Sequence, residues 1–313
     1  MDSFADYLVC INERVKDEIK VAVIDDGING FDKRIADRID PGVSFCRYSD
    51  ANLMNAYFVP SGGHGTTMSS LICRVFPKAK LLIARLDEYR QPETGKRVIT
   101  ARSATEAIRW AISKGAHVIS MSWTIDSRGN DHDIQELRKI IKEAQTDHGT
   151  IMFCAFSDQG NVHAENCVPA SCPETITIGA ATSWASPCTW VDSDSVDYLF
   201  PGEHVLIDRH AKPGTQSKSG SSIATALAAG LAALLLHITQ LAKPAYYPAI
   251  RSKEGIKAAF EKMAAKNKYV HVRSHFHLDF QENAFWQWEA QGREKLATLV
   301  SNLVVDPEVG LFA

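Results

Sequence analysis

The sequence predicts an α/β fold of three layers, in which a mostly parallel central sheet is covered by helices on both faces. Short apolar runs rich in branched residues, such as residues 20–24, have the composition of strands buried on both faces. Longer stretches with helical periodicity alternate with these runs along the chain. Such alternation favours parallel strands, because each helix carries the chain back across the sheet.

The expected elements follow one another in a single domain, residues 20–280, which lies between an N-terminal helical lead-in, residues 1–19, and a C-terminal extension, residues 281–313. The apolar spacing of residues 4–19 predicts the lead-in helix. Strands are expected at residues 20–24, 80–84, 117–123, 150–155 and 175–180. Helices are expected at residues 67–75, 101–114, 133–148, 223–236 and 254–264, with a polar loop over 88–100.

The C-terminal extension is predicted to form an amphipathic helix over residues 283–305. Its apolar face consists of Phe285, Trp286, Leu296, Leu299, Val300, Leu303 and Val304. A face of this kind either packs on the core of its own chain or docks to a partner, and the sequence leaves both possibilities open.

Composition and charge exclude several classes of partner. The 34 basic and 37 acidic residues give a net charge of −3, so no basic field would attract nucleic acid or a membrane surface. The most apolar run, residues 223–236, is too short to span a bilayer and is expected to be a core helix. The N-terminus lacks the pattern of a signal peptide, and the seven cysteines have no disulfide-framework spacing. A cytoplasmic protein with reduced thiols is therefore expected.

Three residues have the local settings that nucleophilic acyl transfer requires, namely a nucleophile, a base and an anion that orients the base. Asp25 ends a buried strand, His64 lies in a glycine-rich loop that opens a helix, and Ser222 opens the apolar helix. Taken singly, Asp25 could be a turn former, His64 one of eleven ordinary histidines and Ser222 a helix cap. Their joint occurrence favours a catalytic triad.

Three motifs resemble those of the subtilisin-like serine proteases. Residues 21–28 (VAVIDDGI) resemble the aspartate motif, residues 63–66 (GHGT) the histidine motif, and residues 220–224 (GSSIA), followed by Gly230, the serine motif. The order of aspartate, histidine and serine along the chain also agrees with that family. The resemblance covers about residues 18–280. It implies the subtilisin-like fold and a serine endopeptidase that acts on proteins or peptides without a cofactor.

By this resemblance, Ser222 attacks the peptide carbonyl, His64 acts first as base and then as acid, and Asp25 holds the imidazole. Asp26 and Ser221 are the neighbouring rivals. The register of the motif and the direct strand exit favour Asp25 over Asp26, and Ser221 stands where the family usually has threonine.

The same resemblance implies which residues meet the substrate. Residues 116–123, 150–160 and 168–170 resemble the substrate-lining strand, the oxyanion loop and the turn beside the specificity pocket. The substrate-binding residues implied in this way are Ser122, Trp123, Thr124, Ala155, Phe156, Ser157, Cys167 and Val168. A modest apolar residue is the expected preference at this pocket.

The oxyanion hole departs from the family pattern, because Asp158 stands where the family has an asparagine. A carboxylate has no hydrogen to donate and repels an oxyanion, and the loss of one donor costs about 10²–10³ in rate. An Asp158 kept protonated by burial and neighbouring negative charge could donate, or the Ser222 N–H could serve with a water in a slow enzyme. In the third alternative, the domain no longer cleaves and has become a binding module.

We expect no calcium requirement. The chain between His64 and the strand at Lys80 is shorter than in secreted members of the family, and it lacks the cluster of acidic oxygen ligands of their calcium loop. An excess of chelator is therefore expected to leave the Tm unchanged. A large drop in Tm would contradict this expectation.

Two further clusters favour ordinary structural roles. His271, His275, His277 and Asp279 could suggest a metal site, but no catalytic carboxylate accompanies them and a polar surface is expected. Cys167 and Cys172 are expected to be free thiols, not a zinc pair or a disulfide. The sequence thus predicts a serine endopeptidase slowed by Asp158. The alternative is a weak or silent subtilase fold that binds peptides or regulates a larger intracellular protein.

Overall fold

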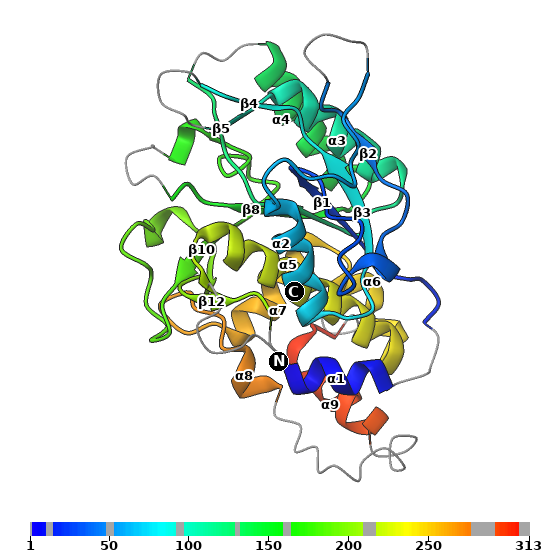
Figure 1. Cartoon of the computed structure of the whole chain (residues 1–313). Coiled ribbons are helices and arrows are strands. Elements are labelled where there is room, and N and C mark those ends of the chain that lie inside the picture. Colours follow the sequence, from blue (N-terminus) through cyan, green and yellow to red (C-terminus); the bar gives the residue numbers. More distant parts are fainter. Residues whose placement is uncertain are drawn as a thin grey trace.

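The computed structural model describes residues 2–10, 15–47, 53–91, 97–128, 132–158, 164–208, 217–276 and 292–306. Its centre is a seven-stranded sheet in which every neighbouring pair of strands is parallel (Figure 1). From edge to edge the strands are β11 (Tyr198–Pro201), β10 (Ile176–Ala181), β8 (Ile151–Ala155), β6 (Val118–Met121), β1 (Lys20–Asp25), β3 (Lys80–Arg85) and β2 (Val43–Ser44). The predicted α/β class with a parallel sheet is confirmed.

Alternate side chains of the central strands enter two different cores, one on each face of the sheet, as β1 shows. Val21 and Val23 of β1 pack in the core that holds α2 (His64–Val75) and α5 (Ser221–Ala242). Ala22 and Ile24 of the same strand pack in a second core, on the opposite face. The helices over this second core are α3 (Ala101–Ser113) and α4 (His132–Thr146). The sheet is therefore buried on both faces, which explains why its strands are continuously apolar.

α5 is the central helix of the domain. It packs against β6, β8 and β10 of the sheet and against α2 and α9 (Arg293–Leu303). By length and composition its 22 residues could cross a membrane, but 89% of its apolar window is buried inside the protein. Such burial is typical of the core helix of a folded domain, as the sequence predicts.

α2 and α5 run side by side in the same direction with their N-terminal ends together (Figure 1). The Lys218 side chain, just before α5, bonds the Thr67 hydroxyl in the first turn of α2. Further along, a Cβ at Gly230 would come within 3.2 Å of the Ile72 Cα. Because Gly230 has no Cβ, the helices approach closely at this point.

The smaller elements depart from the sequence expectations in three places. The loop expected over residues 88–100 contains a hairpin, and α2 begins at His64, three residues earlier than expected. The helical spacing of the lead-in reaches Ile19, but α1 spans Asp2–Cys10 and residues 15–19 are not helical. The paired short strands are β4 (Glu88–Arg90) with β5 (Arg97–Ile99), β7 (Ile125–Asp126) with β9 (Cys167–Val168), and β12 (Val205–Leu206) with β13 (Ser217–Lys218). The remaining α-helices of the described residues are α6 (Tyr247–Ile250), α7 (Lys253–Met263) and α8 (Val272–His275).

The two terminal helices pack on the body of the domain. The Phe4 ring of α1 meets the Phe276 ring edge to face, with centroids 4.9 Å apart. The apolar residues of α9 are buried against α5 and α7, so within the described residues this face is covered by its own chain. Phe285, Trp286, His277 and Asp279, which the sequence singled out, lie outside the described residues.

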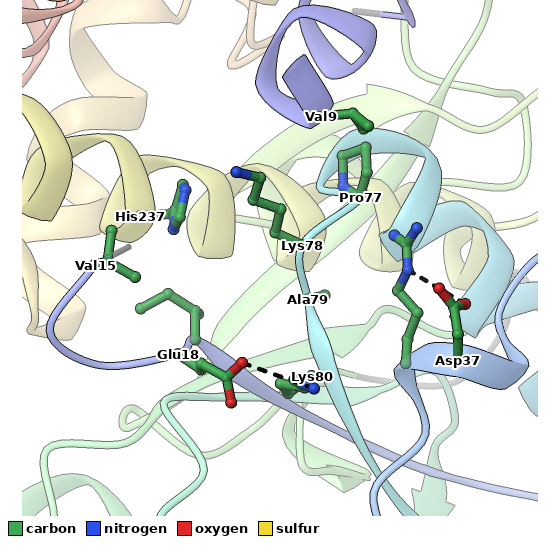
Figure 2. A pocket seen from close by; sticks show the side chains of 11 residues that line it. Val9, Val15, Glu18, Asp37, Pro77, Lys78, Ala79, Lys80 and His237 are labelled. Carbon is green, nitrogen blue, oxygen red and sulfur yellow. Dashed lines mark ion pairs between the residues drawn. The ribbon is translucent and has the colours of Figure 1, made fainter. Parts of the chain in front are cut away.

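A cavity of about 630 Å³ opens where β1 and β3 begin, at the opposite end of β1 from Asp25 (Figure 2). Ion pairs join Glu18 to Lys80 and Asp37 to Arg38 at its wall. The buried His237 also lines it; burial, and to a smaller degree the charge of Lys78, lowers the pKa of this histidine to about 4. None of the predicted catalytic residues borders this cavity.

Candidate active site

Asp25 and His64 are in direct contact. Asp25 is the last residue of β1, and its side chain is almost completely buried. The His64 Nδ1 lies 2.8 Å from one Asp25 carboxylate oxygen and 3.0 Å from the other, while 31% of the histidine side chain remains exposed. With Nδ1 donating to this carboxylate, Nε2 is the ring nitrogen that can accept a proton.

Asp26 has a different task from its neighbour. Its carboxylate accepts hydrogen bonds from the backbone N–H groups of Gly62, His64 and Gly65, at 2.8, 3.1 and 2.7 Å. These donors belong to the turn that opens α2 and to its first residues, so Asp26 anchors the helix that carries His64. The structure therefore separates the two carboxylates: Asp25 contacts the imidazole, and Asp26 holds the backbone around it.

Ser221 and Ser222 also differ in their surroundings. Ser221 is fully buried, and its hydroxyl accepts a hydrogen bond from the Ala180 N–H at 3.2 Å. Ser222 is half-buried, and neither its hydroxyl nor its N–H has a hydrogen-bond partner among the described residues. The Ser222 carbonyl accepts from the Ser122 hydroxyl at 3.2 Å. Of the two serines, only Ser222 presents a hydroxyl that a substrate can reach.

The helix pair places His64 and Ser222 at the same level. Ile72 lies eight residues after His64, and Gly230, which meets it, lies eight residues after Ser222. Both predicted catalytic residues thus stand at the start of parallel, contacting helices. The structure shows no hydrogen bond between their side chains; such bonds are often long before a substrate binds.

Asp158 lies beside the N-terminus of α5. One of its carboxylate oxygens accepts a hydrogen bond from the Ser221 N–H at 2.9 Å, as an acceptor at the N-terminus of α5 does. The Asp158 residue is exposed. The Ser222 N–H is the donor that remains at this helix end.

Six of the eight residues expected at the substrate are buried, among them Trp123, Cys167 and Val168. Trp123 donates its indole N–H to the Ile24 carbonyl at 2.7 Å and packs in the core beneath α3 and α4. Cys167 and Val168, in β9, are fully buried. Tertiary packing turns the Trp123 and Cys167 side chains inward, and their place at the specificity pocket stays a prediction in which the backbone would meet the substrate.

Of the other expected substrate residues, Thr124 and Ser157 are partly exposed and Ser122 is buried. Ser122 contacts the Ser222 backbone, and the Thr124 hydroxyl donates to the Ala155 carbonyl at 3.3 Å. Ala155 and Phe156 are buried at the end of β8, and Ser157 is half-buried. Gln159 and Gly160, which complete the predicted oxyanion loop, lie outside the described residues.

Arg85 is a residue that sequence reasoning missed. It is the register partner of Asp25 on the neighbouring strand, and it is buried. One guanidinium nitrogen, Nη1, donates to the Ala56 carbonyl at 2.9 Å and to the Val59 carbonyl at 2.6 Å. Arg85 thereby ties the end of the sheet to the segment that leads to His64. The sequence signal was a charged residue that ends an otherwise apolar strand.

The cysteines near the sheet are not nucleophiles. Burial raises the pKa of Cys154 to about 12 and that of Cys172 to about 11. Burial, with the negative charges of Glu203 and Asp158, raises the pKa of Cys188 to about 11. Their thiols are therefore protonated at neutral pH. The six cysteines whose side chains the structure describes form no disulfide, as predicted for Cys167 and Cys172. The described residues contain no group of three or more side chains that could hold a metal ion.

The chain is similar to the subtilisin-like protease het-Q2 of Podospora anserina, with 30% identity over 196 residues, which cover 57% of this chain and 50% of that protein. The chain therefore spans about half the length of this curated relative.

Three solved structures share the fold. The nisin leader peptidase NisP from Lactococcus lactis has a TM-score of 0.63 at 15% identity, covering 84% of this chain and 87% of its own. A cold adapted subtilisin-like serine proteinase has a TM-score of 0.59 at 22% identity, over 84% and 89%. The prenylagaramide maturation protease PagA has a TM-score of 0.60 at 22% identity, over 80% and 84%. The model of the Subtilase family matches residues 16–276, which is most of the chain. The protein therefore belongs to the subtilase family of serine peptidases.

Proposed function

We propose that this chain is a serine endopeptidase that hydrolyses peptide bonds through Asp25, His64 and Ser222 and an acyl-enzyme intermediate. The observation that carries the proposal is the contact between the buried Asp25 carboxylate and His64 at the level of Ser222. An aspartate that accepts a hydrogen bond from Nδ1 orients the ring so that Nε2 can act as the base. The partly exposed Ser222 hydroxyl is the nucleophile, and the substrate is a protein or peptide.

The reaction follows from these positions. His64 Nε2 takes the Ser222 proton as the hydroxyl oxygen attacks the scissile carbonyl, and Asp25 stabilises the imidazolium that forms. His64 then delivers the proton to the leaving amine, and an acyl-enzyme remains on Ser222. A water, activated by His64, hydrolyses this ester and regenerates the serine.

This site has few hydrogen-bond donors to stabilise the oxyanion. The Ser222 N–H at the positive end of α5 can donate to the developing negative charge. The Asp158 carboxylate, held beside the same helix end by the Ser221 N–H, supplies no second donor. We therefore propose a slow enzyme in which one backbone N–H, a water and the helix dipole stabilise the oxyanion.

A second function is favoured by the same aspartate. A carboxylate fixed next to the oxyanion position is compatible with a weak or silent subtilase fold that binds peptides within a larger intracellular protein. The matched segment covers 50% of the het-Q2 protease, so that relative has a further part that this match does not include. For the leading proposal, the names of the fold neighbours include maturation and leader-peptide proteases, whose substrates are polypeptides.

A fluorophosphonate probe distinguishes the two functions, because it forms a covalent bond only with an activated serine. We expect the complete chain to be labelled at Ser222, with loss of labelling after Ser222→Ala or His64→Ala. Mass spectrometry of the labelled peptide locates the modified residue. Absence of labelling between pH 6 and pH 9, in a chain that circular dichroism shows to be folded, would support the silent module.

A further inference from the structure

We propose that Lys218 makes this peptidase prefer substrates with an acidic side chain in the first or second residue after the cleaved bond. The inference rests on the proposed function, because it concerns which leaving peptides the same site prefers, namely those with a negatively charged side chain. It concerns the segment immediately before α5, where β13 (Ser217–Lys218) runs into Gly220 and the two serines.

The position of the Lys218 ammonium group is set by two contacts. Lys218 pairs with Val205 in the short antiparallel ladder of β12 and β13, which fixes its backbone. Its Nζ donates to the Thr67 hydroxyl at 2.9 Å, and that hydroxyl donates to the Gly63 carbonyl at 3.0 Å. Thr67 comes three residues after His64 on α2 and therefore lies on the same face of that helix. The ammonium group thus stands about one helical turn from the proposed catalytic base.

The chemistry of the reaction identifies which part of the substrate lies beside Lys218, the part before the scissile bond or the part after it. His64 must deliver a proton to the nitrogen of the leaving amine, so the leaving peptide lies on the His64 side of Ser222. Lys218 belongs to the segment just before Ser222, and its side chain reaches α2, the helix of His64. It therefore borders the substrate residues that follow the scissile bond.

The charge of Lys218 is available to a substrate. The residue is exposed, and no carboxylate among the described residues forms an ion pair with it. Its side chain bonds the neutral Thr67 hydroxyl. The buried carboxylates nearby are engaged elsewhere, Asp25 with His64 and Asp26 with the backbone of α2. A glutamate or aspartate of the leaving peptide would give the ammonium group a carboxylate partner, with the long lysine side chain adjusting to its position.

The first experiment maps cleavage sites. A proteome-derived peptide library, amidated at its carboxyl ends so that only side chains carry the negative charge, is digested with the complete chain and analysed by mass spectrometry. We expect acidic residues to be enriched roughly threefold to fivefold in the first two positions after the cleaved bond, the range that one exposed ion pair provides. Lys218→Met should remove the enrichment, and Lys218→Glu should replace it with enrichment of lysine and arginine. Lys139→Glu, at an exposed lysine on α4, is the control for net charge and should keep the wild-type profile.

The second experiment does not require hydrolysis. Fluorescence anisotropy measures the binding of labelled, amidated peptide pools, identical except for glutamate or glutamine at two positions, to the Ser222→Ala chain with and without Lys218→Met. If the wild-type chain cleaves no peptide in the first experiment but the Ser222→Ala chain binds glutamate peptides more tightly than glutamine peptides, and Lys218→Met removes this difference, the proposed hydrolysis is overturned and the role of Lys218 is supported. Cleavage with identical profiles for wild type, Lys218→Met and Lys218→Glu would overturn the role of Lys218 and leave the peptidase intact. Absence of a charge preference in both experiments also overturns it.

Discussion

Ser222→Ala is expected to lower kcat/KM for peptide hydrolysis by about 10⁴- to 10⁶-fold, the range by which loss of a triad residue slows serine proteases. The hydroxyl that attacks the carbonyl would be gone, while the helix that carries it would remain. Because the Ser222 hydroxyl has no hydrogen-bond partner among the described residues, the free energy of unfolding should change by less than about 1 kcal/mol. A quenched fluorogenic peptide measures the rate, and urea unfolding measures the stability.

Ser221→Ala is the matched control and should have the opposite effects. Its hydroxyl accepts from the buried Ala180 N–H, which would lose its partner, so the chain should lose about 1–3 kcal/mol of stability. The Ser221 backbone N–H, which bonds Asp158, would be kept, and hydrolysis should continue. Loss of activity in the Ser221 variant together with full activity in the Ser222 variant would show that the nucleophile has been assigned to the wrong serine.

Asp158→Asn is expected to raise kcat by about 10²–10³-fold, the contribution of one oxyanion-hole donor. The amide oxygen of asparagine can keep the hydrogen bond from the Ser221 N–H, and the amide nitrogen then stands where aspartate has its second oxygen. The substitution would remove a negative charge and add a donor without changing the size of the side chain. Initial rates with saturating fluorogenic peptide provide the measurement.

Asp158→Ala distinguishes the effect of adding a hydrogen-bond donor from the effect of removing the negative charge. This variant removes the acceptor at the start of α5, which should cost about 0.5–2 kcal/mol of stability, and it adds no donor. Its rate should stay well below that of Asp158→Asn. If Asp158→Asn hydrolyses the peptide no faster than the wild type, position 158 does not limit the reaction.

The sequence was sufficient for those parts of the site that depend on local structure. Asp25 follows an apolar strand and His64 follows two glycines, so the local sequence alone predicts that each lies at the end of an element. The parallel sheet followed from the continuous apolar runs, because burial on both faces removes polar alternation. For Ser222 the sequence could only rank two adjacent serines. The burial of Ser221 beneath Ala180 distinguishes them.

The remaining features depend on residues that are distant in sequence. No local pattern shows that Arg85 bonds carbonyl groups at Ala56 and Val59, or that the Trp123 indole turns back to Ile24. Asp158 is a similar case: its residue type was visible, whereas its hydrogen bond to the Ser221 N–H depends on how β8 ends beside α5. Such contacts arise from packing between elements, which residue periodicity does not encode.

The burial of α5 has a consequence for the order of events during protein synthesis. Asp25 and His64 leave the ribosome early, but the helix that begins beside Ser222 is covered in part by α9, which is translated later. Until α9 has emerged, the apolar side chains of α5 that face α9 are uncovered, and the helix that carries the serine lacks its complete packing. A peptidase assembled in this way is expected to be harmless to its own unfolded segments while it is being translated.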